Sequence, residues 1–177
     1  TILNADRLTA VLTLSIAGLI LGIGYTAPPL KLSWRTWGEV TVALTHSVLL
    51  VLFGHVSQGG SLTAEPLRIA APIFFAVLPS IILAGFPDLE ADAAVGKKTL
   101  VVRVGRRIAV GVAAASTLLA ILLWAALHAN PAWLALPILI HSTALLLALA
   151  DYYRQPRSGR INGLLILALT YMLWFVW

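Results

Sequence analysis

The sequence contains one strongly charged stretch, Phe86-Pro87-Asp88-Leu89-Glu90-Ala91-Asp92-Ala93-Ala94-Val95-Gly96-Lys97-Lys98-Thr99-Leu100. Three of the seven acidic residues of the chain fall within five positions of this stretch, and two lysines follow. The sequence on either side is predominantly apolar. Charged residues concentrated in a hydrophobic protein usually mark a functional site.

Asp88 and Asp92 are four positions apart, which places both carboxylates on one face of a helix. Two carboxylates held this close repel each other unless a cation lies beside them. Mg²⁺ is commonly held by one or two carboxylates together with substrate phosphates, and Lys97, Lys98 and Arg103 would meet the remaining phosphate oxygens. The pattern indicates a diphosphate site. An ordinary charged loop between two membrane helices explains the same spacing, and both readings stay open at this point.

The composition is that of an integral membrane protein. Hydrophobic residues make up 60% of the 177 residues, the mean hydropathy is +0.94, and only 11% of residues are charged. A soluble domain has about 25% charged residues. The chain has no cysteine, which excludes thiolate chemistry and cysteine-type zinc sites. We expect the chain to lie in a lipid bilayer and to bind no nucleic acid.

Six stretches are long and apolar enough to approach the requirement for a membrane span, which is about 20 residues. We expect an all-α membrane bundle of about six transmembrane helices, forming a single transmembrane domain over residues 1–177. Pro72 and Pro79 should break the third span and bend it toward a cavity ahead of Asp88. The six stretches are Leu8–Ile23, Val40–Val56, Ile69–Phe86, Ile108–Leu127, Trp133–Ala150 and Ile161–Trp177.

The basic residues alternate between connections. Ten of the twelve lysines and arginines lie in or next to the first, third and fifth connections, and Arg7 and Arg68 are the exceptions. By the positive-inside rule these three connections are cytoplasmic; in a bacterium the membrane would be the plasma (inner) membrane. We therefore expect the three polar connections to converge over one cavity on the cytoplasmic side, which would hold the active site. Trp174 and Trp177 suit the opposite interface.

The segment Gly24–Leu32 ends the first span with a Pro28-Pro29 pair. Such a pair stops a helix and favours an extended segment, which would present Tyr25 and Lys31 at the membrane surface. There the phenol would contact a phosphate or a charged intermediate, and the ammonium would bind phosphate. An interfacial tyrosine with a snorkelling lysine is the structural alternative.

Three further polar residues are candidates for a substrate pocket. His46 and His141 lie within spans, where an ionisable group usually faces a cavity or a partner helix; a neutral histidine bonded across helices is the alternative for both. Asp151 closes the fifth span and would add to the polar rim. Glu39 begins the second span, where a negative charge is favoured, and is interpreted as structural.

Two motifs together resemble the UbiA-type superfamily of intramembrane prenyltransferases. The first is Asp88-x-x-x-Asp92 with Gly96-Lys97-Lys98-Thr99-Leu100 and Arg103-x-Gly105 downstream, which looks like the family's second aspartate-rich motif. The second is Tyr25-x-x-Pro28-Pro29-x-Lys31 followed by Trp37-Gly38-Glu39, which looks like the connection between the family's fourth and fifth helices. The resemblance covers the whole chain, as the last six of nine helices.

The resemblance implies a membrane transferase that moves an isoprenyl group from a prenyl diphosphate to a membrane-soluble or aromatic acceptor such as a quinone precursor. Mg²⁺ would be the cofactor. The roles that the resemblance implies are Asp88 and Asp92 as Mg²⁺–diphosphate ligands, Lys97, Lys98 and Arg103 as phosphate contacts, and Tyr25 and Lys31 as the family's tyrosine–lysine element.

The chain departs from the family pattern in one respect. The family's first motif, of the Asn-Asp-x-x-Asp type, is absent, and the partial match Asn4-Ala5-Asp6 lies on the wrong side of the membrane. Three spans are absent with it, and the chain begins at Thr1 rather than methionine. We expect this segment to be the C-terminal two-thirds of an enzyme with half of the metal site, and to be inactive alone.

Two other functions compete with this one. A transferase that moves a phosphosugar onto polyprenyl phosphate would share the Mg²⁺ site but need a more polar pocket. A non-catalytic membrane protein, either a transporter or a degenerate paralogue, is the second. A transporter would carry polar or broken helices near the midplane, whereas here the polar residues gather at one surface.

Overall fold

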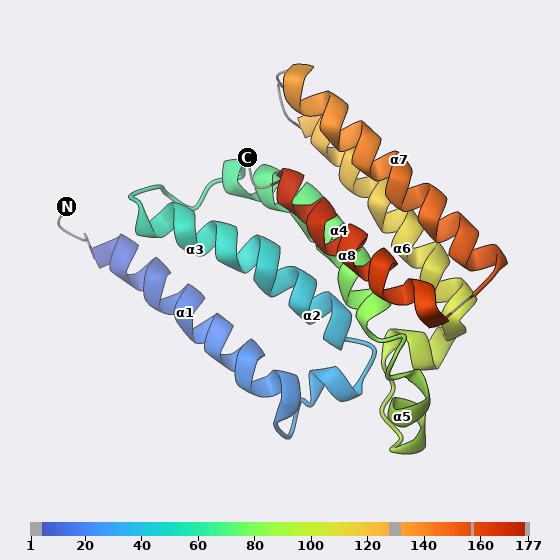
Figure 1. Cartoon of the computed structure of the whole chain (residues 1–177). Helices are drawn as coiled ribbons and strands as arrows, with labels where there is room; N and C mark the ends of the chain where they lie inside the picture. Colours follow the sequence, from blue (N-terminus) through green and yellow to red (C-terminus); the bar gives the residue numbers. More distant parts are fainter. Residues whose placement is uncertain (1–4, 128–131, 157, 176–177) are drawn as a thin grey trace.

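A computed structural model describes residues 5–127, 132–156 and 158–175, and within these ranges the chain is helical with no strand. The helices run side by side as an antiparallel bundle (Figure 1). Five of them are long and apolar enough to cross a membrane, and the shorter apolar helix Ile161–Phe175 is the sixth. The predicted helical membrane bundle is confirmed.

The elements follow the predicted order of spans and connections. The 22-residue helix α1 and the 20-residue helix α4 span without interruption, whereas the second span carries a π-helical turn, labelled η2, in its middle. The bounds are α1 Ala5–Thr26, η1 Leu32–Trp34, α2 Gly38–Leu44, η2 Thr45–Leu49, α3 Leu50–Ser57, α4 Glu65–Ala84, α5 Leu89–Ala94, α6 Leu100–Leu127, α7 Ala132–Arg154, η3 Ser158–Arg160, α8 Ile161–Tyr171 and η4 Met172–Phe175.

Helix α4 lies at the centre of the bundle and contacts α2, α3, α6 and α8. Both α4 and α6 carry fully buried small residues, which are Ala70 and Ala76 on α4 and Ala109, Ala113 and Ala120 on α6. Small side chains let two membrane helices approach closely, which is how such helices associate where lipid removes the hydrophobic driving force between them. The helix that leads to the carboxylates is therefore the best-anchored element of the fold.

The prediction that Pro72 and Pro79 break this helix is wrong. Both prolines lie inside α4, which runs unbroken from Glu65 to Ala84, and both are almost completely buried. A proline inside a membrane helix is tolerated when neighbouring helices and polar side chains satisfy the backbone groups it frees. The α4 helix also begins before the predicted Ile69, because Pro66 in its first turn is preorganised for a helix start.

The predicted loop Asp88–Arg107 contains more helix than expected. Helix α5 occupies its first part, and α6 begins at Leu100, eight residues before the predicted span, with a bend at Gly105 (φ 78°, ψ 162°). Glycine adopts this positive φ without steric cost. The last predicted span is shorter than expected within the described residues and ends in the 3₁₀ turn η4; Trp177 lies outside them.

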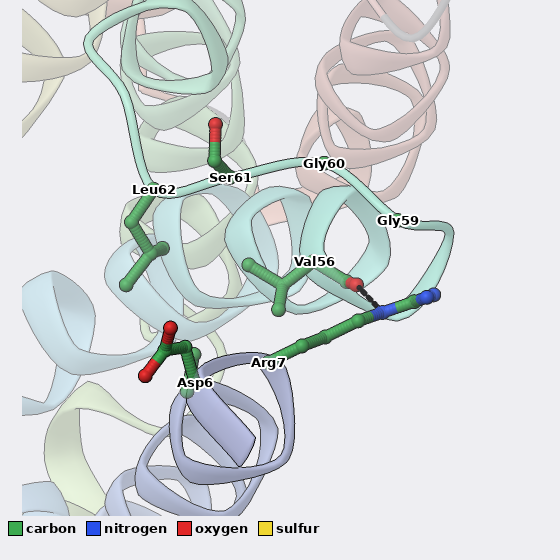
Figure 2. Close-up of a pocket in the computed structure, with 8 residues that line it drawn as sticks. Asp6, Arg7, Val56, Gly59, Gly60, Ser61 and Leu62 are labelled. Atoms are coloured by element: carbon green, nitrogen blue, oxygen red, sulfur yellow. Dashed lines mark hydrogen bonds between the residues drawn. The ribbon is translucent and has the colours of Figure 1, made fainter. Parts of the chain in front are cut away.

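The first helix is peripheral. Gly24 is the only buried residue of α1, and its contacts are with η1 and the second span. Near its N-terminal end, Asp6 and Arg7 line a cavity of about 350 Å³ against the Gly59–Leu62 turn, and Arg7 Nε donates a 2.8 Å hydrogen bond to Val56 O (Figure 2). The opposite end of α1 adjoins η1 (Figure 1). Asp6 is therefore a helix length away from Tyr25, about 30 Å at 1.5 Å per residue.

Candidate active site

Asp88 and Asp92 occupy one turn of helix, as their spacing predicts. Asp88 precedes α5, and its carbonyl accepts a 2.7 Å hydrogen bond from the Asp92 N–H. The Asp88 side chain makes no capping hydrogen bond to α5 and is exposed, whereas Asp92 is buried. Both carboxylates line the same cavity, of about 230 Å³.

The end of α5 turns the chain back toward these carboxylates. Gly96 has a positive φ of 75°; its N–H bonds to Ala93 O at 3.1 Å, and the Lys97 N–H bonds to Asp92 O at 2.9 Å. This pair of bonds is a Schellman motif, in which glycine takes the left-handed position at no steric cost. The turn returns Lys97 over α5, where its Nζ lies 3.0 Å from Asp92 Oδ1.

The cavity collects residues from four segments of the chain. Tyr25 comes from the end of α1, Glu39 from the start of α2, and Thr99 from the residue before α6, and these join the carboxylates and Lys97. Apolar residues of α2 and α4, among them Val42 and Ile81, complete its wall. The structure thus brings together the phenol, the two carboxylates and one of the predicted lysines.

Glu39 takes a larger part than the sequence suggested. It is only 8% exposed, and its Oε1 accepts a 2.8 Å hydrogen bond from the Leu100 N–H at the start of α6. A carboxylate at a helix N-terminus is stabilised by the unpaired N–H groups and the helix dipole. Glu39 lies in the first turn of α2, as predicted. Its contact with the start of α6 joins residues 61 positions apart and was not visible in the sequence.

Two buried polar atoms in this cavity have no hydrogen-bond partner within the described residues: Glu39 Oε2 and Thr99 Oγ1. Both residues line the cavity that contains Asp88 and Asp92. Buried polar atoms are nearly always paired in native proteins. A carboxylate oxygen and a hydroxyl without partners in the lining of one cavity are therefore available to a bound ligand.

The donor set fits Mg²⁺ as far as it extends. Oxygen ligands are what Mg²⁺ requires, and one or two carboxylates with substrate phosphates commonly suffice; the exposed Asp88 and the lysine-paired Asp92 provide two. No group of three potential metal-binding side chains exists among the described residues. A magnesium ion held by these two carboxylates would complete its coordination with oxygens of a bound ligand and of water.

The predicted phosphate-binding cations separate into two places. Lys97 lies with the carboxylates, whereas Lys31, Lys98 and Arg103 line a neighbouring groove of about 750 Å³ that also contains Arg35. The segment after Tyr25 is a turn rather than the predicted extended segment, with a 3.0 Å hydrogen bond from the Lys31 N–H to the Ala27 carbonyl and with Lys31 in a left-handed conformation. This turn directs the tyrosine and the lysine to different sites.

The three pocket candidates lie away from the carboxylate cavity. His46 is exposed, and its Nδ1 is 2.9 Å from Val42 O in its own helix. His141 binds across helices: Trp174 Nε1 donates to its Nδ1, and its Nε2 donates to Leu167 O, both at 2.9 Å. This arrangement fixes one neutral tautomer and matches the structural alternative for that histidine.

Asp151 forms an ion pair with Arg160 and lines a separate cavity between α7 and α8. The α7–α8 connection lies at the same end of the bundle as α5 (Figure 1). The first and third connections do converge, since Lys98 N–H donates to Trp34 O at 2.9 Å. The fifth connection shares their end of the molecule but not their cavity.

Comparison with known proteins places the chain in a family. The sequence profile of the UbiA prenyltransferase family matches residues 3–169. A 2-carboxy-1,4-naphthoquinone phytyltransferase of Synechocystis is 31% identical over 100 residues, which are 55% of this chain and 32% of that protein. A 1,4-dihydroxy-2-naphthoate octaprenyltransferase of Bacillus subtilis is 27% identical over 103 residues, 58% of this chain and 33% of that protein.

The alignments thus span about a third of the length of each relative. No solved structure matches the chain. The profile match extends over nearly all of the chain, including the cavity that collects Tyr25, Asp88, Asp92 and Lys97. The chain belongs to the UbiA prenyltransferase family.

Proposed function

We propose that this chain carries the diphosphate-binding site of a membrane prenyltransferase that transfers an isoprenyl group from a prenyl diphosphate to an aromatic acceptor. The observation that carries the proposal is the cavity in which two carboxylates, a lysine and a tyrosine converge from separate segments. A diphosphate needs cations around its oxygens, and carboxylates are useful to it only through a metal ion between them. The family membership agrees with this chemistry.

The reaction breaks the bond between the allylic carbon and the diphosphate oxygen, and the electron pair leaves with the diphosphate. The acceptor ring carbon then bonds to the allylic cation, and the ring loses a proton. A magnesium ion held by Asp88 and Asp92 would neutralise charge on the departing diphosphate. Lys97 adds a positive charge beside the same oxygens, since it already lies 3.0 Å from Asp92.

The remaining residues of the cavity protect this chemistry. An allylic cation is destroyed by water, so the site has to be dry. Val42, Ile81 and Ala84 form an apolar wall beside the carboxylates, and Tyr25, from the end of α1, lines the same cavity. The Tyr25 ring is half-buried and would face the cation with its electron-rich surface.

The acceptor is proposed to be a bicyclic aromatic acid or quinone precursor. Both relatives are named for naphthalene-type acceptors that bear a carboxyl group. The apolar wall of the cavity disfavours the alternative of a phosphosugar, which would need polar partners for its hydroxyl groups. Offering each acceptor class to the same preparation separates the two functions.

We place this site at the cytoplasmic face. The carboxylate cavity and the groove that contains Lys31, Lys98 and Arg103 are lined by residues from the connections next to α5, and α5 projects from one end of the bundle (Figure 1). Basic residues concentrate in cytoplasmic connections. Most of the basic residues lie at this end, whereas Arg7 is an exception near the other end of α1. A single cysteine introduced at Glu90 tests this placement, because the chain has no other cysteine. In sealed inverted vesicles, a membrane-impermeant thiol reagent should label this cysteine.

The test of the function is a pair of substitutions in the complete gene product, Asp88→Asn and Asp92→Asn. Each should lower Mg²⁺-dependent pyrophosphate release from a prenyl diphosphate, with 1,4-dihydroxy-2-naphthoate as acceptor, by about 100-fold or more. Glu90→Gln is the matched control, because Glu90 is exposed and does not line the cavity. Full activity in either aspartate variant would remove both residues from the proposed site.

A further inference from the structure

One carboxylate oxygen and one hydroxyl in the carboxylate cavity take no part in the proposed diphosphate chemistry. Glu39 Oε2 and Thr99 Oγ1 are buried without a hydrogen-bond partner in the described ranges of the chain. Glu39 is 8% exposed and Thr99 is 9% exposed, and both residues line the cavity that contains Asp88 and Asp92. Because buried polar atoms are nearly always paired, these two atoms point to a second ligand in this cavity.

The cavity's own groups leave Glu39 Oε2 without a donor. Lys97, a cation of the cavity lining, lies 3.0 Å from Asp92 Oδ1 and is paired there. The other Glu39 oxygen, Oε1, accepts the Leu100 N–H. No group of three potential metal ligands exists in the part of the chain that the structure describes, so Glu39 does not join Asp88 and Asp92 around one metal ion. The partner that suits Oε2 is therefore a hydrogen-bond donor on a bound molecule.

The Thr99 hydroxyl does not fill the local role that its position favours. A threonine directly before a helix usually accepts a hydrogen bond from an N–H of the first turn. Thr99 directly precedes α6, but its hydroxyl makes no such bond, and the Glu39 carboxylate accepts the Leu100 N–H instead. A hydroxyl both donates and accepts, so Thr99 can pair with a ligand oxygen of either kind.

The polarity of the Glu39 oxygen distinguishes between two forms of an aromatic acceptor. A carboxylate only accepts hydrogen bonds, and its position at the N-terminus of α6 favours the charged form. A naphthalene-type quinone precursor of the proposed class exists as a reduced dihydroxy form and as an oxidised quinone. The reduced form donates through its ring hydroxyls, whereas the quinone carbonyls only accept. The reduced ring is also electron-rich, as attack on an allylic cation requires.

We propose that Glu39 Oε2 accepts a hydrogen bond from a ring hydroxyl of the acceptor, that Thr99 Oγ1 binds an oxygen of the same molecule, and that the cavity thereby selects the dihydroxy form over the quinone. This inference rests on the proposed function, since it assigns the residues that recognise its acceptor. Each Glu39 oxygen has its own role: Oε1 holds the start of α6, and Oε2 binds the acceptor. A quinone carbonyl in this place would leave the carboxylate unpaired, and a site built to bind a hydroxyl rejects an analogue that lacks it.

Equilibrium dialysis with the complete gene product in detergent, without prenyl diphosphate, measures the binding of both forms in the absence of turnover. The probes are 1,4-dihydroxy-2-naphthoate, kept reduced under anaerobic conditions, and 2-carboxy-1,4-naphthoquinone. Glu39→Gln keeps an oxygen for the Leu100 N–H and replaces the other oxygen by an NH₂ donor. Glu90→Gln is the matched control, because Glu90 is exposed and does not line the cavity. Equal melting temperatures of the two variants show that both are folded, and Thr99→Val is the second variant.

The unmodified protein and Glu90→Gln should bind the dihydroxy form about tenfold or more tightly than the quinone. Glu39→Gln should bind the dihydroxy form about tenfold more weakly and the quinone at least as tightly as before, because the new NH₂ group donates to a carbonyl. Thr99→Val should weaken the binding of both forms by about two- to tenfold, since a hydroxyl serves either kind of oxygen.

Three results for the unmodified protein would overturn the inference: equal binding of the two forms, tighter binding of the quinone, or binding of neither form. Equal weakening of both forms in Glu39→Gln would also overturn it, because loss of the Leu100 contact alone explains that result. Mg²⁺-dependent binding of inorganic pyrophosphate, measured in the same preparation, tests the proposed function separately. Its absence would refute the diphosphate site, whereas a preference for the dihydroxy form that Glu39→Gln abolishes would still assign Glu39 to the acceptor.

Discussion

Replacement of Glu39 tests whether the two halves of the carboxylate cavity are joined as the structure indicates. Glu39 Oε1 accepts a 2.8 Å hydrogen bond from the Leu100 N–H, and Glu39 is only 8% exposed. Glu39→Ala removes the acceptor and leaves the first N–H of α6 unpaired. Leu100 directly follows the Lys97–Thr99 segment that connects α5 to α6, so the loss should loosen that segment.

The size of the effect follows from the bond that is lost. A hydrogen bond to a charged group contributes about 1.5–3 kcal/mol; taking about 2 kcal/mol, the Leu100 amide should open about 30-fold more often. Glu39→Gln keeps an oxygen acceptor and loses only the interaction of charge with the helix N-terminus. That loss is about 0.3–1 kcal/mol, so the expected increase is about two- to fivefold.

Hydrogen–deuterium exchange of the peptide that contains Leu100 measures this opening in the complete gene product. The matched control is Glu90→Gln, an exposed carboxylate in the same stretch. Faster exchange should be confined to the start of α6 and to the Lys97–Thr99 segment before it. If Glu39→Ala leaves exchange at Leu100 as in the unmodified protein, the Glu39 carboxylate does not hold the start of α6 against α2.

Two further predictions concern local structure. Gly96→Ala should lower the free energy of unfolding by about 1–2 kcal/mol, because φ is +75° at this position. No atom lies within 4 Å of an added Cβ, so backbone strain and not a steric clash causes the loss. Gly111→Ala, also in open space but inside α6, should instead be neutral or stabilising by up to about 1 kcal/mol. Thermal unfolding in detergent compares them, and equal effects would contradict the turn geometry. Trp174→Phe should cost about 1 kcal/mol through the 2.9 Å hydrogen bond that it shares with His141. His141→Phe should cost about 2 kcal/mol, because it also removes the bond to Leu167 O. A double-mutant cycle of the two substitutions should give a coupling energy of about 1 kcal/mol. Metal-dependent binding of diphosphate should be unchanged in both variants. A changed affinity for diphosphate would assign His141 to the substrate site.

Local features of the site were predictable from residue spacing. Asp88 and Asp92 were placed on one helical turn by their separation, and the Asp88–Asp92 hydrogen bond and shared cavity agree. The helical bundle and five of its six spans followed from hydropathy, because lipid requires every backbone polar group to be satisfied inside the segment. Failures of the same reasoning came where packing overrode a local preference. Pro72 and Pro79 read as helix breakers, but in the bundle they are buried within an unbroken helix.

The local sequence is sufficient wherever a structure depends on residues within one helical turn, such as the paired carboxylates and the glycine at 96 that returns Lys97 to them. The composition of the site depends on contacts across about 60 positions, since Glu39 meets Leu100 and Thr36 meets Lys98 only after α2 and α6 have packed on α4. Those contacts separate Lys97 from Lys98, which are adjacent in the sequence but line different cavities. Residue spacing specifies which side chains share a helical face, whereas helix packing sets the cavity that each face lines.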